Sequence, residues 1–504
     1  MKEDYKVDTE GMLQDLNRNR KLPPVWLAFV PLVLLVGLLV CVISAFGSDA
    51  LSGGSQIALL TTSACCVIIG LLLKTMKWDD FERAVSENIS GVSQAILILL
   101  LIGAVGGSWM VSGVVPTMIY YGMQIIDPRW FLVSSCAICA FISVMTGSSW
   151  TTIATIGIAL LGIGKAQGFA EGWIAGAIIS GAYFGDKISP MSETTVLAAS
   201  TTRTSLFTHI RYMGYTTVPS FLITLIIFTV AGLMHHEATA QGVAEFTEGL
   251  EHVFVISPWL MLVPLVTALM IARKLPAVVI LFTATVMACL AAVLVQTDLV
   301  DQIAGDDLGK WMNRFKGVMI LVYGSTSLDT GVPALNELVA TRGMSGMMST
   351  VWLIFCAMIF GASMSAAGMI ESIMRMFIRL AHNTFSLVGS TVGVGLFMNL
   401  VCADQYLSII LTGNMFRDTY ERLGFESRLL SRSTEDAVTV TSVLIPWNSC
   451  GMTQSMVLGV STLVYLPYCF FNYLSPLMTL LVAALGYKIF RHKPKTVSEE
   501  PIVS

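Results

Sequence analysis

The stretch GDKISPMSETTVLAAS, residues 185–200, places three ionisable side chains inside an otherwise apolar segment. An unpaired charge in the centre of a bilayer is costly, and irregular backbone is tolerated there only where it lines a cavity or is buried in protein. Gly185 and Pro190 predict a break in the helix, because proline lacks an amide donor and clashes with the preceding turn. We therefore predict a broken helix over 172–202, with freed carbonyl groups at the break.

The composition indicates a protein that crosses a membrane many times. The 504 residues are 55% hydrophobic and 12% charged, with a mean hydropathy of +0.75. Apolar runs of about 20 residues, the length that spans the hydrocarbon layer, recur along the chain. The sequence has no basic cluster with interleaved aromatic residues, so nucleic-acid binding is not expected. The predicted class is an all-α polytopic membrane protein.

About ten transmembrane helices and two re-entrant hairpins are predicted. The hairpins, 131–164 and 386–416, are expected to enter and leave by the same face. The full crossings are 26–46, 56–73, 93–113, 172–202, 212–234, 253–272, 276–296, 350–370, 433–465 and 471–490.

Lys and Arg placement orients these spans. Loops on one side are rich in basic residues, whereas the loop 235–252 on the other side contains none, as the positive-inside rule requires. The N-terminal segment 1–25 and the tail 491–504 are then both cytoplasmic. The first apolar run, 26–46, is too long for the core of a cleavable signal peptide, so it is expected to remain as a span.

The chain contains a weak internal repeat. An offset of 255 positions brings Gly113 onto Gly368 (368 − 113) and lays the polar tip of the first hairpin over that of the second. Chance similarity between apolar helices is the alternative explanation. The predicted topology makes the repeats 26–234 and 235–490 inverted, an arrangement found in secondary transporters whose substrate sites lie at paired helix breaks near the midplane.

The first break carries the groups expected to bind a cation. Asp186 supplies negative charge, and freed carbonyl and hydroxyl oxygens suit a small alkali ion. Lys187 either neutralises Asp186 or competes with the cation for that carboxylate. Glu193 either takes part in coupling or caps the second half-helix, whose N-terminus favours a carboxylate. The candidate hydroxyl ligands are Ser189, Thr194 and Thr195.

The second break, LIPWNSCGM at 444–452, has the same anatomy, with a proline followed by Asn448 and Ser449. Asp404, in the tip of the second hairpin, is a second candidate for Na⁺ and proton binding. The alternative is a tip carboxylate satisfied by backbone donors. The other tip residues expected at the site are Thr146, Ser148 and Ser149 in the first hairpin and Gln405 in the second.

Two further groups are not assigned to the site. Glu435 and Asp436 precede the second break and fit first-turn acids at the start of the span 433–465, but the sequence leaves their roles open. Cys136 and Cys139 form a C-x-x-C motif in mid-span with no second pair, so we expect packing rather than metal or redox chemistry.

The segment GDKISPMSETTVLA (185–198) resembles the signature of the NhaC-type Na⁺/H⁺ antiporter family, usually closer to G-D-K-x-S-P-x-S-D-T-T-x-L-A. ADQYLSIILTGNMFRDTY (403–420) and LSRSTEDAVTVTSVLIPWNSCG (430–451) resemble later blocks of that family. The similarity runs from about residue 26 to 490. Glu193 stands where Asp is usual, and Val196 where Asn is often found. The resemblance implies a sodium-coupled secondary transporter with inverted repeats.

The function expected is exchange of Na⁺ for H⁺ by alternating access across the cytoplasmic membrane of a prokaryote. The family also contains exchangers of organic acids such as malate and lactate and transporters of amino acids, so Na⁺-coupled movement of a small carboxylate or amino acid is the alternative. A channel is a weaker alternative, raised because inverted repeats and charges in mid-membrane also occur in pores. A membrane enzyme is weaker still, since no metal-ligand spacing or nucleophile–base pairing is present in the sequence. No cofactor is expected. The expected partners are the lipid bilayer, the transported ion or solute and a second copy of the chain in a homodimer.

Overall fold

The computed structural model describes residues 21–46, 53–234, 240–273, 275–305, 309–379 and 383–491. Within these ranges the regular structure is helical, apart from two isolated β-bridges. Nine described helices are long and apolar enough to cross a membrane, and eleven spans result if two bent helix pairs are each counted as one. The predicted all-α polytopic class is confirmed.

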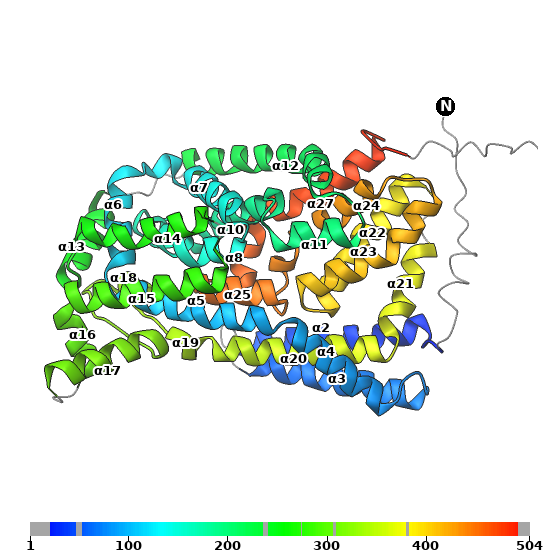
Figure 1. Cartoon of the computed structure of the whole chain (residues 1–504), viewed down its shortest axis with the longest axis horizontal. Helices are drawn as coiled ribbons and strands as arrows, with labels where there is room; N and C mark the ends of the chain where they lie inside the picture. The colour runs from blue at the N-terminus through cyan, green and yellow to red at the C-terminus, as the bar shows by residue number, and fades with distance from the viewer. Residues whose placement is uncertain are drawn as a thin grey trace, which may run out of the picture.

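The N-terminal helices pack against the second half of the chain. α2 (Val25–Phe46) and α3 (Gly54–Leu72) lie beside each other and contact α21 (Met369–Arg379) and α20 (Met348–Ala366), respectively. The amphipathic helix α4 (Trp78–Gly91) also packs on α20. Figure 1 shows α2, α3, α4 and α20 along one edge of the molecule and α12 along the opposite edge, with α10, α11 and α25 between them.

The first predicted repeat contains a hairpin followed by a broken helix. Gly113 adopts a left-handed conformation (φ 80°) between α5 and α6, and Gly147 (φ 68°) turns the chain at the hairpin tip. The break predicted at Pro190 separates α10 from α11. The helices are α5 (Ser93–Val111), α6 (Val114–Ile125), α7 (Phe131–Thr146), α8 (Ser149–Thr152), a π-helical turn (Ile153–Gly157), α9 (Ile158–Ala166), α10 (Glu171–Ile188), α11 (Glu193–Thr201) and α12 (Leu206–Met234).

The second predicted repeat has the same order of elements. Gly368 (φ 73°), the predicted counterpart of Gly113, separates α20 from α21 in the same left-handed conformation. A hairpin follows, and then a helix interrupted over 438–448. The helices are α22 (Thr384–Val401), α23 (Gln405–Arg422), α24 (Ser427–Ala437), a 3₁₀ turn (Ser442–Leu444), α25 (Ser449–Leu458), α26 (Thr462–Tyr465) and α27 (Phe470–Ala484).

The predicted boundaries differ from the structure in several places, among them the start of α12 at Leu206 rather than 212 and the end of the second hairpin at Arg422 rather than 416. The broken span 433–465 begins earlier, at Ser427. The last span ends at Ala484 rather than at 490, and the chain then folds back to form a β-bridge between Arg491 and Phe425. The connection predicted over 235–252 is helical from Ala240 onward.

The first part of the predicted second repeat, residues 240–346, adds a group of helices that pack against the first repeat. It includes a bend of 93° between 244–253 and 258–272. The region 297–346, to which the sequence assigns no crossing, forms four short helices. The helices of the whole group are α13 (Ala240–Val253), α14 (Leu262–Ala272), α15 (Ala277–Val295), α16 (Thr297–Ala304), α17 (Lys310–Tyr323), α18 (Pro333–Val339) and α19 (Gly343–Gly346).

Glycines bring α7 and α10 close together. A Cβ at Gly181 would lie 2.1 Å from the Cys136 carbonyl oxygen, and one at Gly185 would lie 2.4 Å from Cβ of Ser143. Cys136 and Cys139 are free, buried thiols on this face, as packing residues should be. The close approach holds the last turn of α10 against the end of α7, and so places the first break beside the first hairpin tip.

Candidate functional site

The carboxylate of Asp186 lies in the last turn of α10 and is almost completely buried, with 4% of the residue exposed. Both of its oxygens accept hydrogen bonds from hydroxyl groups. Ser149, the first residue after the hairpin tip, donates to Oδ2 at 2.7 Å, and Ser192 donates to Oδ1 at 2.6 Å. The main-chain N–H of Ser149 also interacts with this carboxylate. The hairpin tip and the far side of the break therefore converge on Asp186.

The other hydroxyl groups predicted at the first break divide into two kinds. The Thr195 hydroxyl donates to the freed carbonyl oxygens of Asp186 and Lys187, both at 3.1 Å. The Thr194 hydroxyl lies 2.8 Å from that of Ser192 and so belongs to the same network. Ser189 lies outside it, because its hydroxyl accepts a local hydrogen bond from the Met191 N–H.

The helix that follows the break is capped by Ser192 and not by Glu193. The Ser192 side chain accepts from the Thr195 N–H, as an N-cap serine should. Glu193 stands in the first turn, exposed to solvent, and accepts a hydrogen bond from the Tyr406 hydroxyl at 3.0 Å. Its location at the helix N-terminus agrees with the sequence, but the predicted capping role belongs to its neighbour.

Lys187 pairs with Asp436 and not with the adjacent Asp186. Its ammonium group also donates to the Ser475 hydroxyl at 2.5 Å and lies 5.6 Å from the centre of the Phe471 ring. Both members of the ion pair are fully buried. Asp436 on α24 therefore neutralises Lys187, and Ser475 on α27 adds a hydrogen bond. The negative charge of Asp186 is stabilised by the hydroxyl groups at the break.

Asp404 forms the corresponding acidic group in the second hairpin. It is the N-cap of α23, where Oδ1 accepts from the Leu407 N–H at 3.0 Å. Oδ2 accepts from the Ser449 hydroxyl at 3.1 Å, and the residue is 3% exposed. A backbone donor thus satisfies part of this carboxylate, as the alternative interpretation of Asp404 predicts.

The remaining residues of the second half-site are joined by amide and hydroxyl contacts. The side-chain oxygen of Gln405 accepts from Ser442 at 3.1 Å and from the thiol of Cys450 at 2.9 Å. Asn448 is the N-cap of α25, and its amide nitrogen donates to the Asn399 carbonyl at 3.0 Å. In the first hairpin, the hydroxyl groups of Thr146 and Ser148 are used within the tip itself.

The two half-sites match each other at a constant offset. Ser148 and Asp404, the N-caps that follow the two tips, are 256 positions apart (404 − 148). The N-caps after the two breaks, Ser192 and Asn448, have the same separation. The predicted offset of 255 is therefore correct to one residue, and the repeat extends to the conformation of the chain.

Side-chain contacts recur at the same offset. Ser143 donates to the Ala182 carbonyl at 2.6 Å, and Asn399 donates to the Val438 carbonyl at 2.7 Å. The contact of Ser149 with Asp186 likewise has a counterpart, which is that of Gln405 with Ser442.

Tyr406 and Cys450 connect the two half-sites. The Tyr406 side chain interacts electrostatically with both Asp186 and Asp404. Cys450 interacts with Tyr183 of α10 as well as with Gln405. Asp186 and Asp404, assigned from distant parts of the sequence, therefore belong to one buried polar region.

The sequence interpretation of Glu435 and Asp436 is wrong. Both lie in the last turn of α24 rather than at the start of a helix, and both are fully buried, as is Arg432 on the preceding turn. The signal that could have identified them is the one used for 185–200, namely ionisable residues within a stretch that is otherwise apolar or small. Because the span is predicted to begin at residue 433, Glu435 and Asp436 fall in its first turn, where acidic residues are ordinary.

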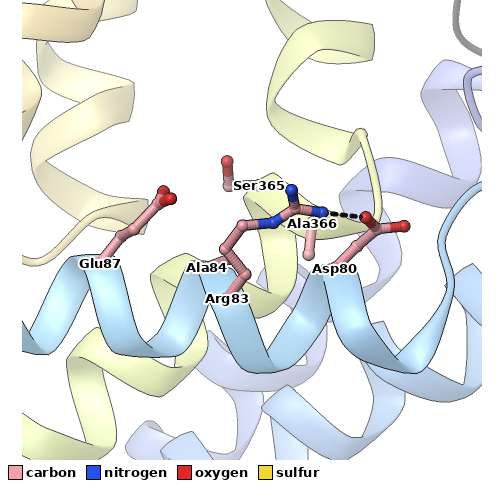
Figure 2. Close-up of a pocket in the computed structure, with 6 residues that line it drawn as sticks. All are labelled: Asp80, Arg83, Ala84, Glu87, Ser365 and Ala366. Atoms are coloured by element: carbon pink, nitrogen blue, oxygen red, sulfur yellow. Dashed lines mark hydrogen bonds and ion pairs between the residues drawn. The ribbon is translucent and has the colours of Figure 1, made fainter.

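A separate surface pocket of about 260 Å³ lies between α4 and the end of α20. Figure 2 shows Arg83 and Asp80, which both lie on α4, joined by an ion pair of 2.6 Å on one side of it. It is lined by Asp80, Arg83, Ala84, Glu87, Ser365 and Ala366, none of which belongs to the half-sites.

Comparison with known proteins assigns the family. The sequence profile of the Na⁺/H⁺ antiporter family matches residues 181–487, which include both breaks and the second hairpin. The Na⁺/H⁺ antiporter NhaC of Alkalihalophilus pseudofirmus is 34% identical over 90% of this chain and 95% of its own length. The chain belongs to the Na⁺/H⁺ antiporter family.

Relatives whose sequence identity to this antiporter is nearly equal carry names that state different substrates. The malate-2H⁺/Na⁺-lactate antiporter of Bacillus subtilis is 32% identical over 89% of this chain and 92% of its own length. The arginine/ornithine antiporter ArcD of Halobacterium salinarum is 32% identical over 95% of this chain and 96% of its own length. Overall identity therefore does not distinguish among the substrates that these names state.

Proposed function

We propose that this chain is a secondary active transporter that exchanges Na⁺ for H⁺ across the cytoplasmic membrane of a prokaryote. The observation that carries the proposal is the buried carboxylate of Asp186 at a helix break, surrounded by hydroxyl groups and with its neighbouring lysine already paired. Membership in the Na⁺/H⁺ antiporter family and the name of the NhaC relative support it.

Na⁺ binding at Asp186 requires oxygen lone pairs that point toward the ion. The Ser149 and Ser192 hydroxyls now donate to the carboxylate, but a hydroxyl can rotate and present a lone pair instead. Thr194 and Thr195 add hydroxyl oxygens at the same break, and Asp404 is the second acidic candidate. Na⁺ and H⁺ each neutralise a carboxylate, so the two compete for Asp186, and one is carried in each direction.

Alternating access follows from the arrangement of the two hairpins and the two broken helices around one buried region. Rocking of this bundle against the remaining helices would open the region first to one side and then to the other. Ser189, Thr146, Ser148, Gln405, Asn448 and Ser449 hold the tips and breaks in shape, and Lys187 anchors α10 to α24.

The test is Na⁺-driven proton movement in proteoliposomes with purified protein and no organic solute. Addition of Na⁺ to acid-loaded vesicles should raise the internal pH, because Na⁺ entry is tied to H⁺ exit. Proton movement that appears only when a dicarboxylate or an amino acid is supplied would contradict the proposal.

The second candidate is Na⁺-coupled transport or exchange of a small carboxylate or amino acid. The names of two relatives favour it. Four helix N-termini also meet in this region, capped by Ser148, Ser192, Asp404 and Asn448, and such termini attract carboxylate groups. Uptake of labelled malate, lactate, arginine and ornithine under an imposed Na⁺ gradient separates this candidate from simple cation exchange.

The orientation proposed for the chain has both termini in the cytoplasm and the hairpins re-entrant. A cysteine at Arg422, in a cysteine-free background, should react only with reagent admitted to the cytoplasm, and one at Gly242 should react from outside. Labelling of both from the same side would contradict this topology. We also propose that the protein uses no cofactor and catalyses no chemical reaction. It acts in the membrane as a homodimer.

A further inference from the structure

The buried face of α24 carries a group of charges that the exchange of Na⁺ at Asp186 does not use. Arg432, Glu435 and Asp436 are all fully buried. α24 packs against α11, α12, α22, α23 and α27 (Figure 1). Charged side chains within a membrane protein mark functional positions, because their burial is costly.

The cations nearby are not paired with Glu435. Lys187 forms its ion pair with Asp436. The Arg432 guanidinium lies over the Tyr212 ring, 4.4 Å from its centre, and none of its nitrogen atoms hydrogen-bonds to a described residue.

Glu435 itself has no fixed donor. Within the described part of the chain, neither of its carboxylate oxygens makes a hydrogen bond of ordinary geometry, although the Thr439 hydroxyl interacts with it from the next turn. The charged groups that act on it are Lys187, Asp186 and Asp436. An ionised carboxylate without donors is unfavourable in such a place, and binding a proton removes the charge.

The other titratable groups on the packed elements do not serve as partners. On α12, His209 contacts Ser431 through Nδ1, and its Nε2 has no partner among the described residues. On α23, Tyr420 interacts with Arg432 and shares a hydrogen bond with Thr391 at 2.9 Å. The transport residue whose carboxylate acts on Glu435 is thus Asp186.

We propose that Glu435 is a second proton-binding site, so that each Na⁺ is exchanged for two protons, one displaced from Asp186 and one released from Glu435. The inference rests on the proposed Na⁺/H⁺ exchange. Protonated Asp186 and Na⁺-bound Asp186 are both neutral, so Na⁺ takes the place of one proton there, and the second proton leaves Glu435 for the same open side. When Na⁺ leaves on the other side, Asp186 and Glu435 each bind a proton from that side. Exchange in this ratio moves one net charge in each cycle.

The experiment compares the wild type with Glu435→Gln in proteoliposomes, with membrane potential set by a K⁺ gradient and valinomycin. Wild-type exchange should respond to the potential and move two protons for each Na⁺. The Glu435→Gln protein should still exchange labelled Na⁺ for Na⁺ at the wild-type rate, but with a ratio of one and no response to the potential. Glu193→Gln, which neutralises an exposed carboxylate near the first break, is the matched control and should keep the wild-type ratio.

Each other outcome contradicts the inference. A Glu435→Gln protein that keeps the ratio of two has its second proton elsewhere. A well-folded Glu435→Gln protein without Na⁺/Na⁺ exchange shows that Glu435 serves Na⁺ binding rather than a second proton. A wild type that exchanges Na⁺ for H⁺ without response to the potential overturns the second proton but leaves the proposed function intact. A wild type with no Na⁺-driven proton movement overturns the proposed function itself.

Discussion

The two half-sites have the same backbone plan but carry their acids in different places. In the first, the acid is Asp186 on the broken helix, and the residue after the tip is Ser149. In the second, Ser442 stands where Asp186 does at the offset of 256 (442 − 186), and the acid is Asp404 at the hairpin tip. The repeated scaffold is therefore close to symmetric, whereas the charge on it is not.

The donors to the two acids also differ, because both oxygens of Asp186 accept from a hydroxyl group whereas only one oxygen of Asp404 does. Asp186 accepts hydrogen bonds of 2.7 and 2.6 Å from hydroxyl groups, which can rotate toward an ion. Asp404 accepts from the Ser449 hydroxyl at 3.1 Å on one oxygen, and on the other from the Leu407 N–H, which has a fixed direction in the first turn of α23. A carboxylate held by a backbone donor stabilises a helix end, and one held by hydroxyl groups can exchange them for a cation. The asymmetry thus suggests a division of roles, with Asp186 as the ion ligand and Asp404 as the anchor.

The largest effect on stability is expected at the ion pair that only the first break possesses. The position equivalent to Lys187 in the second repeat is Val443 (443 − 187 = 256). Asp436→Asn leaves the Lys187 ammonium buried without a counter-charge and should cost about 3–5 kcal/mol of stability. Thermal unfolding in detergent, followed by tryptophan fluorescence, measures the loss.

The double variant Lys187→Met with Asp436→Leu is the control for that prediction. It removes both charges and should recover most of the stability, because the cost arises from the unpaired charge. A double variant as unstable as Asp436→Asn would show that the pair is not what holds α10 to α24.

A smaller loss of stability is expected at the two caps that follow the hairpin tips. Ser148→Ala and Asp404→Ala each remove an N-cap and should each cost about 0.5–2 kcal/mol. Asp404→Asn should cost little, since asparagine caps as well as aspartate does. The same unfolding assay compares them, and a large loss in Asp404→Asn would mean that the charge of Asp404 does more than cap α23.

The smallest effect is expected at Glu193. It is exposed, it is not the cap, and its contact is the Tyr406 hydroxyl at 3.0 Å. Glu193→Gln should change stability by about 0.3–1 kcal/mol through its interaction with the helix N-terminus. Transport at equal expression should stay within about twofold of the wild type, and a dead variant would move the coupling role to Glu193.

Much of this plan could be predicted from the sequence. Apolar length located the spans, Pro190 and Gly185 located the first break, and the match of Gly113 to Gly368 revealed the repeat. These features are local, because a bilayer demands about 20 apolar residues per helix and proline interrupts hydrogen bonding wherever it stands. The same logic brought Ser149, Asp404, Gln405 and Ser449 into the candidate site.

Partner choice could not be predicted. Lys187 is next to Asp186 in the sequence, but successive side chains on a helix point in different directions, so it meets Asp436 from another helix. Glu435 and Asp436 appeared to begin a helix because the span was placed six residues too late (433 − 427). Tyr406 and Cys450 connect the half-sites through contacts that only the folded chain creates.

The division of roles between Asp186 and Asp404 is tested most directly by the Na⁺ concentration that gives half-maximal exchange of labelled Na⁺ for Na⁺ in proteoliposomes. Asp186→Asn keeps the volume of the side chain but removes its charge, and it should weaken Na⁺ binding by more than tenfold, which is about 1.4 kcal/mol or more. Asp404→Asn keeps the cap of α23 and should change that concentration by less than about threefold, or roughly 0.7 kcal/mol. The opposite result, with Asp186→Asn near the wild type and Asp404→Asn unable to bind Na⁺, would contradict the account.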